Sequence, residues 1–340
     1  MPRPSVRDVA DRAGVSVGTV SHVLNHPERV AQSTRDRVRA AIDELGFVRS
    51  ETARRLRHGG SSLVGVLVHD ISNPFFTEAA RGIEDRLRED GHVPMLGSTD
   101  SDPERERDLM SLLAGMDVRG VIVTPSASTL DNLAVLAGRG IRVVLMDHPP
   151  LSAELSTVSG DDVAGARAAA AHLIELGHRR IGFVNGPLTV RQAVDRRDGV
   201  ITALTEANLD PAEALTEIEA VSAGQGFTAD AGAVGAAALL GGEPRPTALI
   251  CANDQIAIGA MREVRRRGLR IPEDVAIVGY DDVSVAAELI TPLTSVRQPM
   301  REMGAAAADM LLSNDGTIRH ITFPPRLIVR ESTVGRRPRS

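Results

Sequence analysis

A cluster of side chains between residues 16 and 25 combines hydroxyl, amide and imidazole groups, which can form hydrogen bonds with DNA. Val20, Val23 and Leu24 form an apolar stripe there, so the spacing predicts a helix with Ser16 as its N-cap. The face opposite the stripe presents Ser16, Val17, Gly18, Thr19, Ser21, His22 and Asn25. Side chains at the amino-terminal end of such a helix can meet phosphates and base edges in a major groove.

Two further helices must position that face. The first stops at Gly14 and has a helical stripe of Val6, Val9, Ala10 and Ala13. The last is expected to begin at a capping box, Ser33 to Asp36, and to end at Gly46. Its stripe comprises Val38, Ala41, Ile42 and Leu45. The pattern over residues 1–46 therefore predicts an all-α, three-helix helix-turn-helix headpiece.

Positive charge is concentrated at this end of the chain. The formal net charge of the 340 residues is -6, but residues 1–60 contain 11 arginines against 7 acidic residues. A basic module on an acidic body indicates that a small part of the chain meets a polyanion.

The headpiece contains an ordered series of motifs, namely Val6-Arg7-Asp8-Val9-Ala10, Ala13-Gly14-Val15-Ser16, Thr19-Val20-Ser21, Val23-Leu24-Asn25 and Thr34-Arg35. With these motifs it resembles the headpiece of the LacI/GalR family of transcriptional repressors. The resemblance implies that Val17, Gly18 and His22 choose the operator sequence. It also implies that backbone phosphates are held mainly by Ser16, Thr19, Ser21, Asn25 and Thr34.

Residues 47–60 are predicted to form a linker with a short hinge helix. Ser50 is its expected N-cap, and Gly59-Gly60 is expected to end it. A helix this short is unstable by itself and forms only with stabilising contacts. In the family, the matching helices of two subunits pair in the minor groove. The resemblance therefore adds Ser50 and Ala53 to the DNA contacts and makes Leu56 a wedge between base steps.

From Ser62 onward, short aliphatic runs alternate with helical patterns, including helices expected over 196–207 and 227–240. This alternation predicts an α/β core of two doubly wound subdomains. With the family resemblance, we expect a periplasmic-binding-protein-like core over 61–340. Chain crossings are expected near Ser159, Ile290 and Thr322. One subdomain then comprises about 61–159 and 291–322, and the other about 160–290 and 323–335.

Polar or aromatic residues follow strand after strand, at 71–76, 146–148, 161–162, 251–254 and 279–282. Ligands of such sheets bind at the carboxyl ends of strands. The family match places Arg196 and Asp281 in the cleft, where they can satisfy adjacent hydroxyls of a small metabolite, which we expect to be a sugar. The remaining expected effector-binding residues are the aromatic walls Phe75, Phe76 and Phe227, with His148, Asp161 and Asp254.

Catalysis is not expected. No lysine occurs, which excludes Schiff-base chemistry, pyridoxal phosphate attachment and a phosphate-loop lysine. The single Cys251 excludes an intramolecular disulfide and multi-cysteine metal sites. The dinucleotide-like run Gly224 to Ala229 lies deep in the chain and is interpreted as a coincidence. We expect no metal and no cofactor.

These observations predict a cytoplasmic homodimeric repressor that binds a near-palindromic operator on double-stranded DNA and responds to a small-molecule effector. The sequence has neither a secretory signal nor an apolar stretch of about 20 residues, so no membrane association is expected. The alternative is a cytoplasmic solute-binding or sugar-processing protein with an incidental basic head.

Overall fold

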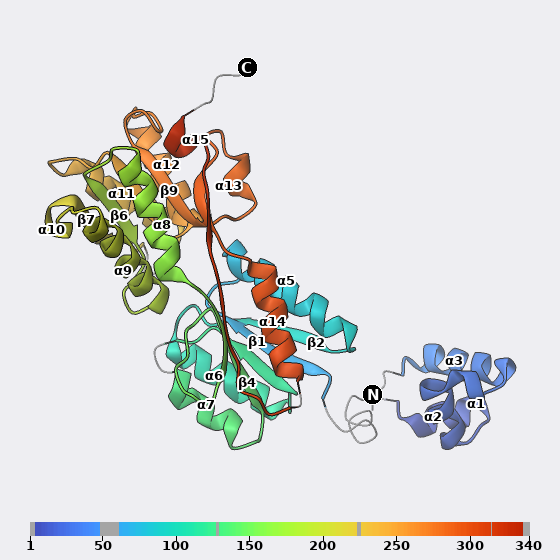
Figure 1. Ribbon diagram of the computed structural model, residues 1–340. Coiled ribbons are helices and arrows are strands. Elements are labelled where there is room, and N and C mark those ends of the chain that lie inside the picture. The colour runs from blue at the N-terminus through green and yellow to red at the C-terminus, as the bar shows by residue number, and fades with distance from the viewer. Residues whose placement is uncertain (1–3, 48–60, 127–128, 223–225, 314, 336–340) are drawn as a thin grey trace. The chain divides into compact units, whose positions relative to one another are not determined.

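The computed structural model describes residues 4–47, 61–126, 129–222, 226–313 and 315–335 (Figure 1). The chain forms two compact units, Met1–Ser61 and Ser62–Ser340. Within the described ranges, every helix is too short or too polar to cross a bilayer.

The first unit contains α1 (Val6–Ala13), α2 (Val17–Asn25), the 3-10 turn η1 (Pro27–Arg29) and α3 (Gln32–Leu45). Its core is formed mainly by Val9, Val20 and Val38, none of which is exposed. Gly14 and Gly46 end α1 and α3 in the left-handed conformation, as predicted.

The predicted capping box at Ser33 is wrong. With Ser33 as N-cap the first helical residue would be Thr34, but α3 begins two residues earlier, at Gln32, after Ala31, which supplies no side-chain cap. The headpiece does contain a capping box, but at the start of α1, where the Ser5 hydroxyl accepts from the Asp8 amide and Asp8 accepts from the Ser5 amide. Ser33 is the second residue of α3, and Asp36 is the fifth and lies beyond the first turn.

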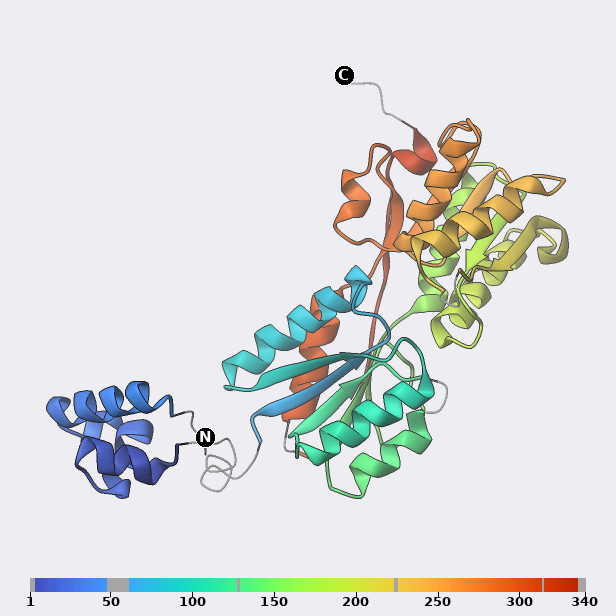
Figure 2. The same cartoon turned by 180° about the vertical axis from the view of Figure 1, so that it is seen from behind.

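The first lobe of the second unit has a six-stranded parallel sheet of order β11-β5-β4-β3-β1-β2. The strands are β1 (Leu63–Val68), β2 (Val93–Ser98), β3 (Gly120–Val123), β4 (Arg142–Met146), β5 (Ser156–Gly160) and β11 (His320–Phe323). Helices α5 (Pro74–Glu89) and α14 (Met300–Leu312) lie side by side on one face (Figure 2). Helices α6 (Pro103–Gly115) and α7 (Thr129–Ala137) cover the other face.

The second lobe has a six-stranded sheet of order β12-β10-β9-β8-β6-β7. The strands are β6 (Ile181–Asn185), β7 (Leu215–Glu219), β8 (Ala248–Cys251), β9 (Ala276–Asp281), β10 (Thr294–Arg297) and β12 (Arg326–Ile328), of which β12 is antiparallel. The long helices are α8 (Asp162–Glu175), α9 (Arg191–Glu206), α11 (Ala229–Gly241) and α12 (Asp254–Arg266). The short helices of this lobe are α10 (Pro211–Ala214), α13 (Val285–Glu288) and α15 (Glu331–Val334).

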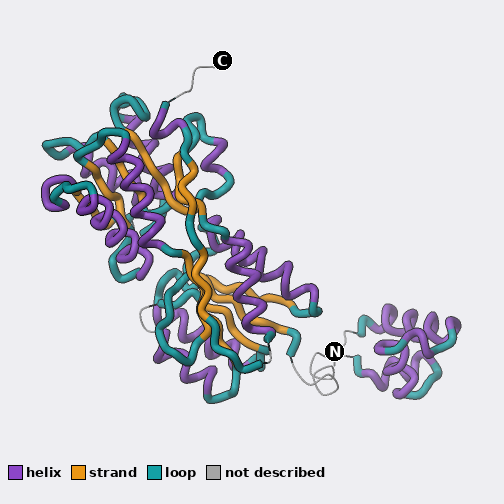
Figure 3. Tube along the Cα trace, viewed as in Figure 1, coloured by secondary structure: helices purple, strands orange, loops and turns teal. Residues whose placement is uncertain are grey.

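The chain passes between the lobes after β5, β10 and β11, and the connections run side by side (Figure 3). The predicted boundary near Ile290 is wrong, because β10 pairs with β9 and therefore belongs to the second lobe. The crossing comes at Gln298-Pro299, where proline lacks the amide hydrogen that would extend the ladder. The helical head and two-sheet α/β core confirm the predicted fold class.

Gly199, on α9, allows α9 to pack closely against α8. A Cβ at Gly199 would lie 2.3 Å from the carbonyl oxygen of Val163, on α8. Only a residue without a side chain therefore permits this close packing of α8 against α9. The contact fixes Arg196, one turn earlier on α9, against the first turn of α8.

Candidate functional site

The exposed face of α2 presents small and polar groups at the amino-terminal end of the helix. Val17, Gly18 and His22 are exposed, and Val17 retains 40% of its accessible surface. Val17 is not among the side chains that form the apolar core of this unit. The face can therefore approach another molecule without rearranging the core of the first unit.

The remaining predicted DNA contacts on α2 hold one another in place. Ser16 caps the helix by accepting from the Thr19 amide, and their hydroxyl oxygens are 2.9 Å apart. One turn later, the Asn25 side-chain amide donates to the Ser21 carbonyl oxygen at 2.8 Å and to its hydroxyl at 3.2 Å. Thr34 lies half-buried in the first turn of α3. Ser50, Ala53 and Leu56 lie outside the described residues.

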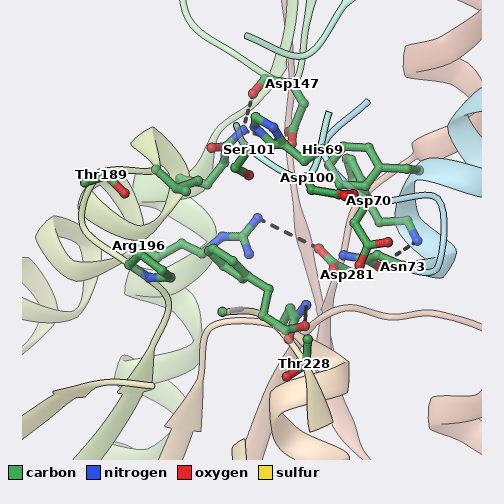
Figure 4. Close-up of a pocket in the computed structure, with 18 of the residues that line it drawn as sticks. His69, Asp70, Asn73, Asp100, Ser101, Asp147, Thr189, Arg196, Thr228 and Asp281 are labelled. Carbon is green, nitrogen blue, oxygen red and sulfur yellow. Dashed lines mark hydrogen bonds and ion pairs between the residues drawn. The ribbon is translucent and has the colours of Figure 1, made fainter. Parts of the chain in front are cut away.

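A cavity of about 400 Å³ is lined by residues that follow strands of both lobes (Figure 4). Its volume falls in the usual range for small-molecule sites. The predicted residues that line it are Phe75, Phe76, Arg196, Phe227 and Asp281. The remaining polar lining residues are His69, Asp70, Asn73, Asp100, Ser101, Asp147, Thr189, Gln192, Thr228 and Asn253.

Arg196 is 4% exposed and is held on several sides. Its Nε donates to Asp162 Oδ1 at 2.8 Å, its Nη1 donates to the Ala252 carbonyl oxygen, and its guanidinium carbon lies 3.8 Å from the centre of the Tyr280 ring. Its Nη2 lies 3.8 Å from Asp281 Oδ1. Burial alone would lower the pKa of Arg196, but the surrounding carboxylates raise it, so the group stays charged.

Asp281, the last residue of β9, is 3% exposed and accepts from the Gln298 side-chain amide at 3.1 Å. Burial raises the pKa of this carboxyl to about 7, although Arg196 and Gln298 act in the opposite direction. The group can therefore accept or donate a hydrogen bond near neutral pH.

Asp147 links the lobes. It follows β4 of the first lobe, and the side-chain amide of Gln192, on α9 of the second lobe, donates to its Oδ2 at 2.9 Å and to its carbonyl oxygen. Burial, and after it the nearby Asp162, raise the pKa of Asp147 well above its ordinary value. The carboxyl group therefore holds a proton more readily than an exposed aspartate does.

Aromatic rings form the apolar walls. Phe75 and Phe76, at the start of α5, meet edge to face with their centres 5.0 Å apart, and His69 meets Phe76 in the same way at 5.8 Å. Phe227 contributes from the loop before α11. Phe227, Asp147 and Asp281 all have positive φ angles, and such strained backbone positions are concentrated at binding sites.

Three expected effector-binding residues lie outside the cavity lining. Asp161 caps α8 by accepting from the Ala164 amide. Asp254 is buried behind the cavity, where it accepts from the Val283 amide at 2.8 Å and the Ser295 hydroxyl at 2.6 Å. The His148 ring lies 2.7 Å from the Pro149 carbonyl oxygen. Each has a local structural partner.

Sequence reasoning did not assign His69, Asp147 or Gln192 to the site. His69 directly follows strand β1, so the strand-end rule would have found it, whereas Asp147 belongs to the predicted strand-end segment 146–148, from which His148 is the predicted site residue. Gln192 lies in the first turn of α9, and no pattern in the sequence singles it out.

Two protein families match the chain. The bacterial regulatory proteins of the lacI family match residues 5–50, and the periplasmic binding protein-like domain matches residues 170–333. The HTH-type transcriptional repressor PurR of Vibrio atlanticus is 35% identical over 333 residues, covering 96% of this chain and 98% of the relative. The chain belongs to the LacI family of bacterial regulatory proteins.

Solved structures extend the match to LacI-family members with ligands. A lac repressor dimer bound to operator and the anti-inducer ONPF is 29% identical with a TM-score of 0.81, over 98% of this chain and 99% of that one. The complex of the transcriptional regulator CelR with cellobiose is 32% identical with a TM-score of 0.70, over 97% of this chain and 100% of that one. This LacI-family chain is a ligand-responsive transcriptional regulator.

Proposed function

We propose that this chain represses transcription as a homodimer that binds a near-palindromic operator, and that a sugar-like effector in the cavity changes its affinity for DNA. The observation that carries the proposal is the presence in one chain of an exposed α2 face and a cavity lined from two lobes. Because the target is chromosomal DNA, we place the protein in the cytoplasm.

The head would read DNA through α2. Val17 can contact a thymine methyl group, His22 can hydrogen-bond to a base edge, and Gly18 allows close approach to the groove. Ser16, Thr19, Ser21, Asn25 and Thr34 would mainly contact phosphates. The mutual hydrogen bonds of Ser16 with Thr19 and of Ser21 with Asn25 support this division, because they pre-position the polar groups.

Two heads are needed for a palindrome, and the lac repressor relative was solved as a dimer on its operator. We propose the same assembly here. In that assembly, the segment 47–60 would supply paired hinge helices, with Ser50 and Ala53 contacting DNA and Leu56 inserted at the central step.

The effector would bind between Arg196 and Asp281, with the phenylalanine rings against its apolar faces. Arg196 Nη2 can donate to one hydroxyl, and Asp281 can accept from a neighbouring one. Because the lining comes from both lobes, a ligand would favour one angle between them. Coupling of about 1–3 kcal/mol between the cavity and DNA binding would suffice.

Selection of bound sequences from a random DNA pool tests this function. The protein is incubated at fixed salt, with and without a mixture of sugars and nucleosides, because phosphate contacts make affinity strongly salt-dependent. We expect a palindrome with a flexible pyrimidine-purine step at its centre, and an enrichment that changes with the mixture. Failure to enrich any sequence in either condition would contradict the repressor function.

A further inference from the structure

The single arginine among the described lining residues already has carboxylate and carbonyl partners. The Nε and Nη1 of Arg196 donate to Asp162 and to the Ala252 carbonyl oxygen, and the Tyr280 ring covers one face of the guanidinium. Only Nη2 remains directed at the cavity, beside Asp281. An arginine often binds a phosphate or carboxylate with the parallel N–H groups of Nε and one terminal nitrogen, and here Nε is already occupied by Asp162.

Carboxyl groups outnumber this cation on the cavity wall. Asp70, Asp100, Asp147 and Asp281 all line it, and Figure 4 shows them around the space that Arg196 faces. The chain has no lysine, and the other basic lining side chain is His69. Burial, and after it the nearby His148, lower the pKa of His69 to about 4, so this ring is neutral at physiological pH.

Two lining side chains have a polar atom without a partner among the described residues. His69 Nδ1 and Asp147 Oδ1 are both buried and form no hydrogen bond, although their residues are only 9% and 5% exposed. Such atoms lose the water that they had in the unfolded chain without gaining a replacement. Both belong to the first lobe, across the cavity from Arg196 (Figure 4).

We propose that the cavity selects uncharged ligands and rejects phosphate esters and carboxylates, with His69 and Asp147 as a second polar subsite for a ligand hydroxyl or amide. This inference rests on the proposed effector function of the cavity. A neutral hydroxyl can donate to one of these groups and accept from the other. An anion would add negative charge to a buried site whose cation is already paired.

Matched ligand pairs test the charge selection on the full chain. The pairs are D-ribose with D-ribose 5-phosphate, D-glucose with D-glucose 6-phosphate, and adenosine with its 5′-monophosphate, measured by thermal shift and titration calorimetry. We expect at least one neutral member to bind, and its ester to bind at least about 100-fold more weakly. Equal or tighter binding of any ester would overturn the inference while supporting an effector site. If no member of any pair binds, the proposed effector function fails, and the inference fails with it.

Substitutions test the subsite separately. His69→Phe keeps the ring against Phe76 but removes both nitrogens, and Asp147→Asn keeps the shape of the side chain. We expect each to weaken binding of the neutral ligand by about tenfold or more. Operator binding without ligand shows that a variant is folded. The control is Asp198→Asn, on the exposed face of α9, which should bind as wild type does. Wild-type affinity in both subsite variants would remove His69 and Asp147 from the proposal.

Discussion

At Asp281, burial and a neighbouring arginine act on one carboxyl group in opposite directions. Burial is the larger effect and raises the pKa from 3.8 to about 7. At a pH between 3.8 and about 7, Asp281 keeps its proton in the folded chain, whereas the same carboxyl group has released it in the unfolded chain. The free energy of unfolding therefore falls as the pH rises through this window.

Asp281→Asn should remove that contribution. Between about pH 5 and pH 7, we expect the wild type to lose about 1–2 kcal/mol more stability than the variant. Urea denaturation at several pH values measures the difference. His69, whose lowered pKa acts in the opposite direction, is present in both proteins and cancels. Parallel stability profiles would contradict the assignment of a pKa near 7 to Asp281.

Arg196→Lys should abolish the ligand response and leave operator binding intact. A lysine cannot donate to Asp162 and the Ala252 carbonyl oxygen while also lying flat on Tyr280. Loss of the buried pair should lower the free energy of unfolding by about 2–4 kcal/mol. The matched control is Arg262→Lys at the exposed pair with Asp230, where we expect little change. A normal ligand response in Arg196→Lys would remove Arg196 from the site.

His22→Ala should relax sequence preference at one base pair in each half-site. The exposed imidazole is well placed to hydrogen-bond to a base edge, and such contacts contribute about 1–3 kcal/mol of discrimination. Binding to each single-base operator variant measures the preference, and affinity for unrelated DNA serves as the control. An unchanged preference profile would show that His22 does not read bases.

At the scale of elements, the packing of α9 on α8 determines where Arg196 lies. Gly199→Ala would place a methyl group against the Val163 carbonyl oxygen, and we expect a loss of about 1–3 kcal/mol in unfolding free energy, with weaker ligand binding. Gly115→Ala, at the end of α6, is the control, because a Cβ there meets nothing within 4 Å. Equal stability of both variants would mean that the α8–α9 contact tolerates a side chain.

The sequence predicts those elements whose local pattern agrees with their packing. Strand β1 and helices α1 and α2 follow the expected patterns, because β1 buries a continuous apolar run and each helix buries one apolar stripe. The start of α3 was misplaced, since Ser33 and Asp36 fit a capping box in sequence although the helix already begins at Gln32. Strand β10 was assigned to the wrong lobe, because its partner β9 is chosen by tertiary pairing, which a linear pattern does not encode.

The cavity was predictable only in part. Arg196, Asp281 and the phenylalanines follow from the family match and strand ends, and they do line the space. Asp161 and Asp254 also follow strand ends, yet Asp161 accepts from the Ala164 amide in the first turn of α8, and Asp254 accepts from the Val283 amide in the loop before α13. Whether a strand-end aspartate caps a helix or faces a ligand depends on the next few backbone angles, and residue type alone does not determine them.

At the scale of the whole molecule, Leu56 is expected to connect ligand sensing with DNA bending. It lies outside the described residues, so its role stays a prediction from the sequence. Leu56→Ala should weaken operator binding by about tenfold or more while leaving non-specific affinity nearly unchanged, because only the operator is kinked by the wedge. Gel-shift titrations on operator and random DNA measure both affinities. Equal losses on the two DNAs would contradict the wedge.

The two edge strands β11 and β12 have a consequence for how the protein is made. One short stretch, residues 320–328, supplies the last strand of both sheets, whereas the core of the head is complete by Phe47. Domains fold as they leave the ribosome. We therefore expect the head to fold on the nascent chain before either sheet of the second unit has received its last strand.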